Sequence, residues 1–148
     1  GVIKGELLGG CVESLYDQFT GDRYAEEKEI IARYEMFPTI DQWRGKILFA
    51  ETSEEKPSPE KLRQMLKVLE EVGVMGAVSA VIVGKPQDEK FYEEYKQVWL
   101  EVTEQYNLPI MYNINIGHAA PRCILPYGAS VSLDFNTRRI FLDEPLVA

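Results

Sequence analysis

Apolar side chains recur at a helical spacing in two segments of the chain. In the first, Ser58 is suited to cap a helix that begins at Pro59, and Gly73 can end it. The apolar face of this helix consists of Leu62, Met65, Leu66, Leu69 and Val72. The second helix ends before Pro109, and its apolar face consists of Phe91, Tyr95, Val98, Trp99, Val102 and Tyr106. Both patterns predict amphipathic helices that each cover one face of a core.

Short runs of β-forming residues lie before, between and after these helices. Three runs, at 46–50, 77–83 and 110–114, are apolar on both faces. Strands of this kind that alternate with helices predict a parallel sheet with helices on both sides. Two further runs, at 129–135 and 138–142, alternate apolar and polar residues and predict an antiparallel hairpin. The fold class is therefore α/β.

Two helices are also expected in the first quarter of the chain. A short helix at 12–19 follows the pair Gly9 and Gly10, and a charged helical segment occupies 24–34. No internal repeat or linker divides the sequence, so the 148 residues form a single domain.

The charge balance excludes several classes of partner. There are 16 Lys and Arg against 24 Asp and Glu, which gives a net charge of −8, and no basic cluster reverses that sign locally. We therefore expect neither nucleic acid nor an anionic membrane surface as a partner. The uncharged stretch 72–84 is much shorter than the roughly 20 residues of a membrane helix. No leader sequence is evident, and because the first residue is Gly1 we expect an excised or processed chain.

The cysteines and the histidine provide no pattern for a metal site. Cys11 and Cys123 are far apart in the sequence, and neither belongs to a Cys/His cluster. We therefore predict reduced thiols, a cytoplasmic location and no bound metal. Because the sequence also lacks a phosphate-binding loop and a dinucleotide-binding glycine motif, we predict no cofactor.

An acid and an imidazole follow two of the predicted parallel strands. Glu51 comes directly after the run 46–50, and His118 follows the run 110–114. Because parallel strands bring their carboxyl ends to one edge, these side chains can form the acid and base of a hydrolytic triad. The residues alone leave open a solvated acidic loop at 51–55 and a structural histidine.

The nucleophile of such a triad is not evident in the sequence. Ser130 begins an alternating strand rather than the strand-to-helix turn of a nucleophile elbow. Ser53 lies near Glu51 in the sequence, and Ser58 is explained as a helix cap. Cys123 remains open as a thiol nucleophile or as a structural cysteine.

Several motifs, read in order, are shared with one enzyme family. They are GELLGGC at 5–11, GKILFAE at 45–51, VIVGK at 81–85, GH at 117–118 and LPYG at 125–128. The chain thereby resembles the carboxy-terminal domain of the LD-carboxypeptidase (muramoyltetrapeptide carboxypeptidase) family, almost from end to end. The segments ETSEEKPSP at 51–59 and YNINIGH at 112–118 resemble the microcin C immunity peptidase branch most.

This resemblance implies a fold and roles for individual residues. The family fold is a three-layer swivelling β/β/α domain, with a central parallel sheet, helices on one side and a smaller antiparallel sheet on the other. The family enzymes are serine peptidases with a Ser–Glu–His triad, so the resemblance assigns Glu51 as the acid and His118 as the base. Glu54 and Glu55 compete for the acid role, but Glu51 directly follows the strand that holds it. Cys11 stands where the family often has Asn.

The resemblance also implies a partner domain. Residues 1–148 would be the carboxy-terminal domain of a two-domain peptidase whose amino-terminal domain, absent here, supplies the serine, so the isolated domain would be inactive. The substrate would be a murein tetrapeptide or a peptidyl-nucleotide of the microcin C type. The alternative is a non-catalytic ligand-binding or regulatory domain. Family members are commonly dimers, so a homodimer is also expected.

Overall fold

The computed structural model describes residues 1–145, in which strands alternate with helices as the sequence pattern predicts. In chain order the elements are β1 (Val2–Cys11), α1 (Val12–Thr20), α2 (Glu27–Arg33), α3 (Ile40–Trp43), β2 (Ile47–Glu51), α4 (Pro59–Glu71), α5 (Val74–Ala77), β3 (Ala80–Gly84), the 3₁₀ helix η1 (Gln87–Glu89), α6 (Tyr92–Glu104), β4 (Ile110–Ile114), β5 (Ser130–Asp134) and β6 (Arg139–Leu142).

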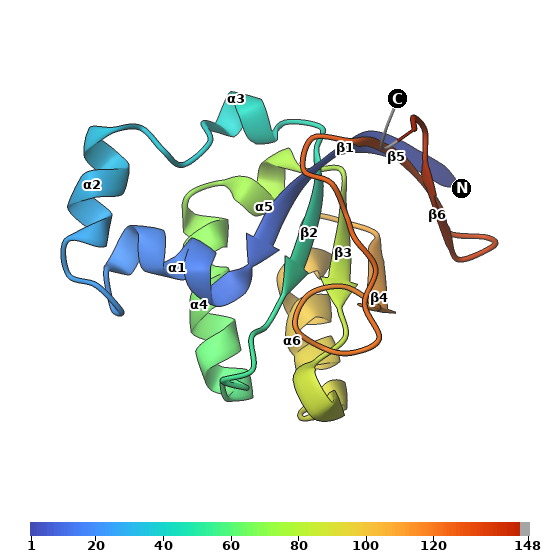
Figure 1. Ribbon diagram of the computed structural model, residues 1–148. Helices are drawn as coiled ribbons and strands as arrows, with labels where there is room; N and C mark the ends of the chain where they lie inside the picture. Colours follow the sequence, from blue (N-terminus) through green and yellow to red (C-terminus); the bar gives the residue numbers. More distant parts are fainter. Residues whose placement is uncertain (146–148) are drawn as a thin grey trace.

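The strands form one mixed sheet of six strands in the order β4-β3-β2-β1-β5-β6. Strands β1 to β4 run parallel, whereas β5 is antiparallel to both β1 and β6. The long strand β1 belongs to both parts, because its first half pairs with β5 and its second half pairs with β2. Figure 1 shows β1 passing from the antiparallel part, beside β5, to the parallel part beside the helices.

Two apolar clusters fill the two faces of the sheet. The larger cluster contains side chains of α1, α4, α5 and α6 together with Leu48, Ala50, Val81 and Val83 from the strands. The alternate strand residues, such as Ile47, Phe49 and Ile82, pack with Ile116, Val131 and Leu133. The predicted α/β fold, with helices on one side and a smaller antiparallel part, is confirmed. The expectation of helices on both faces is wrong, because the second face of the sheet, which includes side chains of β5, packs against residues of the segment between β4 and β5, such as Ile116 and Leu125.

Strand β1 and the start of β3 differ from the sequence prediction. The motif that contains Gly5, Gly9 and Gly10 was not expected to form a strand, yet it lies within the longest strand of the described chain. A Cβ atom at Gly9 would lie 1.9 Å from the carbonyl oxygen of Phe49, so glycine permits the close approach of β1 and β2. The predicted strand 77–83 is shorter, because α5 occupies Val74–Ala77.

The local signals of α4 are present as predicted. Ser58 Oγ accepts a hydrogen bond from the Lys61 amide, and Pro59 is the first helical residue. The side chains of Leu62, Met65, Leu66 and Leu69 are buried. By contrast, no side chain of α2 is buried, and this helix stands apart from the sheet in Figure 1. No helix within residues 1–145 combines the length and apolarity needed to cross a bilayer.

Candidate active site

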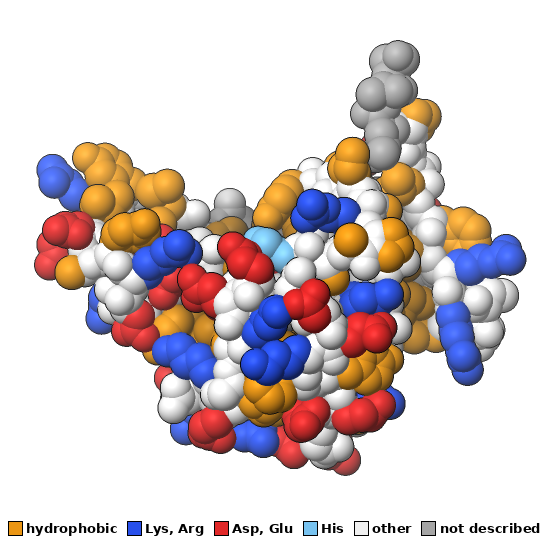
Figure 2. Space-filling model, turned by 60° about the horizontal axis from the view of Figure 1, so that its bottom comes forward, with side chains coloured by type: hydrophobic (Ala, Val, Ile, Leu, Met, Phe, Trp, Pro, Cys, Tyr) orange, Lys and Arg blue, Asp and Glu red, His pale blue; other side chains and the backbone are white. Residues whose placement is uncertain are grey.

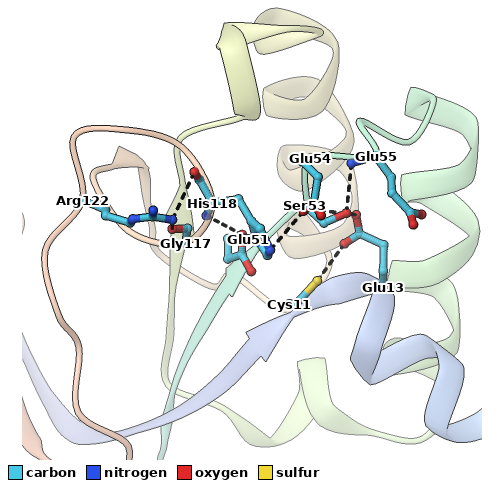
Figure 3. Close-up of polar contacts among 9 residues, drawn as sticks. All are labelled: Cys11, Glu13, Glu51, Ser53, Glu54, Glu55, Gly117, His118 and Arg122. Carbon is cyan, nitrogen blue, oxygen red and sulfur yellow. Dashed lines mark hydrogen bonds and ion pairs between the residues drawn. The ribbon is translucent and has the colours of Figure 1, made fainter.

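Glu51 and His118 meet at the carboxyl edge of the parallel strands. Glu51 is the last residue of β2, and His118 follows β4 in the turn that leaves the sheet. His118 Nδ1 lies 2.7 Å from Glu51 Oε2, and the His118 main-chain N–H donates to the same oxygen over 3.1 Å. The predicted approach of these two side chains is therefore present, as Figure 3 shows.

The Glu51 carboxylate lies against a glycine in the turn before His118. Gly117 has a φ of +83°, and a Cβ atom there would lie 2.4 Å from Glu51 Oε2. A larger residue would therefore displace the carboxylate in addition to straining the backbone. The Arg122 guanidinium donates to the carbonyl oxygens of Gly117 and His118 from the outside of the turn, over 3.3 Å and 3.4 Å.

The environment of His118 favours its protonated form. The hydrogen bond with Glu51 is the largest influence and raises the pKa of His118, partial burial opposes it, and the charges of Glu51, Glu54 and Glu13 raise the pKa further. The Glu51 side chain is only 9% exposed, whereas that of His118 is 39% exposed. The pair thus joins a buried acid to a ring that reaches the surface. Figure 2 shows the histidine at the surface with carboxylates beside it.

Glu54 contacts the second nitrogen of the same ring. Its Oε2 atom lies 3.2 Å from His118 Nε2, and its side chain is 68% exposed. The sequence predicted Glu54 as a competitor of Glu51 for the acid position. The structure places the two carboxylates on different ring nitrogens, so the buried acid at Nδ1 is Glu51. Among the described residues, the carboxylates that contact the His118 ring are those of Glu51 and Glu54, and Glu55 makes no such contact.

Glu13 is a polar residue of the site that sequence reasoning missed. It lies in the first turn of α1, and its Oε1 accepts hydrogen bonds from the Ser53 amide and hydroxyl, both over 2.8 Å. The Cys11 thiol donates to Oε2 of the same carboxylate over 3.2 Å. Glu13 therefore ties the end of β1 to the loop after β2. The sequence did not indicate Glu13 because strand β1, which positions this residue, was not predicted.

The hydroxyl and thiol groups that the sequence offers as nucleophiles form hydrogen bonds with groups other than His118. The Ser53 hydroxyl donates to Glu13, and the Ser130 hydroxyl donates to Asp143 over 3.2 Å. The Cys123 thiol donates to the Asn115 carbonyl oxygen over 3.1 Å. Burial raises the pKa of Cys11 to about 12, so this thiol is protonated at neutral pH.

Two cavities flank the Glu51–His118 pair. One, of about 400 Å³, lies on the side of α1 and α4, and its walls include His118, Glu54, Glu13 and Lys61. The other, of about 290 Å³, is bounded by Glu51, Phe49, Leu125 and Tyr127. Residues 1–145 contain no group of three or more His, Cys, Asp or Glu side chains that could hold a metal ion. The Glu51–His118 pair and the two cavities thus place a base and an acid beside space for a substrate.

The chain matches a known domain family over most of its length. The model of the LD-carboxypeptidase C-terminal domain matches residues 4–133. The chain therefore belongs to this family of carboxypeptidase-like domains, as the motifs predicted.

Individual relatives are similar to the chain over almost its whole length. The microcin C7 self-immunity protein MccF of Escherichia coli is 29% identical over 152 residues, which cover 97% of this chain and 38% of that protein. An MccF-like protein from Streptococcus pneumoniae, whose crystal structure was solved in complex with AMP, has a sequence 44% identical to this chain. The two structures superpose with a TM-score of 0.92, and the match covers 96% of this chain and 41% of that one.

A second solved structure shows the same fold. The muramoyltetrapeptide carboxypeptidase of Oxalobacter formigenes is 21% identical with a TM-score of 0.67, over 95% of this chain and 45% of that one. In these three matches, this chain spans 38%, 41% and 45% of the relative.

Proposed function

We propose that this chain is the carboxy-terminal domain of a two-domain serine peptidase and supplies two members of its Ser–Glu–His triad. His118 is the general base, and Glu51 is the acid that orients it. The observation that carries the proposal is the 2.7 Å contact between His118 Nδ1 and the buried Glu51 carboxylate, in a domain of the LD-carboxypeptidase family.

The geometry fits the proton transfers that acyl transfer requires. With Nδ1–H donated to Glu51, the neutral ring has its lone pair at Nε2, which can accept the proton of a serine hydroxyl as the oxygen attacks a carbonyl carbon. The imidazolium so formed lies against the Glu51 carboxylate, which stabilises it. The ring then returns the proton to the leaving group, and a water molecule repeats the sequence to release the acyl group.

The serine and the oxyanion hole belong, in this proposal, to a separate amino-terminal domain. The hydroxyls and thiols near His118 in residues 1–145 are held by other partners, so the ring needs a nucleophile from outside this chain. The two-domain enzyme would act in the cytoplasm, as a monomer or as a homodimer.

We propose a nucleotide-bearing substrate, such as a peptidyl- or aminoacyl-adenylate. The AMP complex of the Streptococcus pneumoniae protein, which is 44% identical to this chain, supports this substrate class. The microcin C7 self-immunity protein MccF, solved in complex with aspartyl sulfamoyl adenosine, supports the same class. A murein tetrapeptide, suggested by the family description, is the second substrate to be tested.

The test is a chimera in which the amino-terminal part of the Streptococcus pneumoniae MccF-like protein precedes Gly1. The chimera should hydrolyse a peptidyl-adenylate faster than muramoyl tetrapeptide, measured as kcat/KM for each. A higher kcat/KM for the tetrapeptide would instead indicate that the substrate is a murein peptide. No hydrolysis of either substrate by a folded chimera would favour a non-catalytic domain.

The variants of this chimera test the roles of the two residues. His118→Ala should lower kcat by about 10³-fold or more, because the imidazole deprotonates the serine. Glu51→Gln should cost somewhat less, since it removes the charge but leaves the ring packed. Cys123→Ala is the control and should retain the parent rate. A His118→Ala chimera with near-normal kcat would disprove the proposed triad.

A further inference from the structure

Both nitrogens of the His118 ring are occupied by carboxylates. Nδ1 lies 2.7 Å from Glu51 Oε2, and Nε2 lies 3.2 Å from Glu54 Oε2. A carboxylate is only a hydrogen-bond acceptor, so both contacts are attractive together only when each ring nitrogen carries a proton. Two carboxylates at these distances therefore fit the imidazolium form of the ring, which cannot accept a further proton.

Glu54 stands where a nucleophile must stand. A serine hydroxyl that gives its proton to Nε2 has to approach this nitrogen to about 3 Å. The Glu54 carboxylate already lies at that distance from the same nitrogen. The oxygen of Glu54 and the oxygen of a serine therefore compete for one position beside the ring.

We propose that Glu54 is a gate on His118: its carboxylate occupies the place of the nucleophile at Nε2 and must withdraw before the imidazole can act as a base. This inference rests on the proposed function, because it assumes that Nε2 receives the proton of a serine. Glu51 is the permanent partner of the ring and Glu54 the exchangeable one.

The surroundings of the two carboxylates support this division. The Glu51 side chain is 9% exposed and lies at the end of β2, whereas the Glu54 side chain is 68% exposed and lies in the following loop. The backbone of that loop is anchored, because the Ser53 amide and hydroxyl both donate to Glu13 and the Glu55 amide donates to Ser53 Oγ. The Glu54 side chain can therefore move into solvent while the backbone of the loop stays in place.

The other charged and titratable groups around the ring have partners of their own. Glu13 on α1 accepts from Ser53 and from the Cys11 thiol, which ends β1. Arg122 donates to the carbonyl oxygens of Gly117 and His118 and lies outside the turn. Glu54 is therefore the one carboxylate in the described part of the chain that reaches Nε2.

The number of protons on the ring determines how the gate responds to pH. In the closed state the ring holds two protons, and one of them points to Glu54. Opening releases the Nε2 proton to solvent and leaves a lone pair that repels the carboxylate, so the side chain withdraws. The serine hydroxyl can then enter and transfer its proton to Nε2. The gate is closed at acidic pH and opens as the pH rises.

The first test measures the contact without any catalysis. His118 is the only histidine of the 148 residues, so its ring resonances can be followed by NMR during a pH titration of the chain itself. Glu54→Gln should lower the titration midpoint of His118, because the neutral amide does not stabilise the imidazolium. Glu55→Gln removes the same charge one residue away and should lower the midpoint less. Equal midpoints in the two variants would disprove the gate.

The second test measures the effect of the gate on the two-domain chimera. Glu54→Gln should shift the acidic limb of the kcat/KM profile to lower pH and raise kcat/KM on that limb by about two- to fivefold, the range expected for an exposed ion pair. Glu55→Gln should shift the acidic limb less than Glu54→Gln does. A Glu54→Gln chimera with lower kcat/KM at every pH would overturn the gate and make Glu54 a helper of the reaction.

The two proposals fail in different experiments. If His118→Ala leaves the chimera active, the proposed triad is wrong whatever the NMR titration shows, and the gate falls with it. If His118→Ala abolishes activity but Glu54→Gln and Glu55→Gln titrate alike, the triad stands and the gate alone is wrong.

Discussion

At the scale of single residues, the site depends on how closely Gly117 approaches Glu51. The carboxylate accepts the ring and main-chain N–H of His118 at one oxygen, and this oxygen lies directly against Gly117. The turn therefore positions the ring only if position 117 carries no side chain. This requirement can be separated from ordinary backbone strain, because Gly128 also has a positive φ, of +75°, but would direct a Cβ atom into open space.

We expect Gly117→Ala to break the Glu51–His118 pair and Gly128→Ala to preserve it. Both substitutions place an alanine in the left-handed region and should cost about 1–2 kcal/mol of stability. Only Gly117→Ala should also move the pKa of His118 toward its ordinary value, since the displaced carboxylate no longer accepts from the ring. NMR titration of the single histidine measures this difference.

An unchanged titration in Gly117→Ala would contradict this account. It would mean that the turn relaxes around the added methyl group without moving Glu51. Comparable changes in both variants would instead attribute the effect to backbone strain.

The raised pKa of His118 also predicts how stability depends on pH. A group whose pKa is higher in the folded than in the unfolded state stabilises the fold fully below the unfolded value, about 6.5 for histidine. This stabilisation is lost as the pH rises through the higher folded value. The Tm of the chain should therefore exceed that of His118→Asn most near pH 5.5, and the difference should shrink above neutrality. A difference that is constant with pH would show that the ring contributes by packing alone.

The roles of these residues could be predicted from the sequence to different extents. Glu51 and His118 could be paired because each follows a recognisable parallel strand, and strand ends share an edge. Glu13 could not, because its position depends on β1, which carries glycines where a strand pattern carries apolar residues. The contact of Glu54 depends on the path of a loop, and no spacing in the sequence specifies it.

At the scale of secondary structure, amphipathic helices were easier to predict than strand β1 at the sheet centre. The faces of α4 and α6 follow a 3.6-residue period because one side of each helix packs on the sheet. Strand β1 has no comparable pattern, because its contacts vary along its length. Its first half pairs with β5 and its second half with β2, where Gly9 must lie against Phe49.

The cap of α4 provides a test of these local signals. Ser58 Oγ accepts from the Lys61 amide at the start of the helix that leads away from the site loop. Ser58→Ala should lower the free energy of unfolding by about 1 kcal/mol, because this amide then has no protein partner. Ser58→Asp retains an acceptor and should stay close to the parent value. Urea unfolding measures both, and equal losses in the two variants would show that the hydroxyl acts by another contact.

At the scale of the whole molecule, the arrangement of layers leaves the sheet edge with the Glu51–His118 pair accessible. The helices cover one face of the sheet, and the segment between β4 and β5 packs on the other, so the carboxyl ends of β2 and β4 lie between these two layers. His118 lies at this edge and is partly exposed (Figure 2). A second domain can therefore bring a nucleophile to the ring without disturbing either core.

The chain alone should not hydrolyse muramoyl tetrapeptide or a peptidyl-adenylate. In residues 1–145 the Ser53 hydroxyl is held by Glu13, the Cys11 thiol has a pKa of about 12, and the Cys123 thiol donates to a main-chain carbonyl. The ring itself faces two carboxylates. A general base without a nucleophile or an oxyanion hole has no reaction to accelerate. Product formation should therefore stay at background with the purified chain and appear with the chimera.

Turnover by the chain alone that His118→Ala abolishes would disprove this prediction and indicate Cys123 or Ser53 as the nucleophile. Turnover that survives His118→Ala would instead come from a contaminating enzyme.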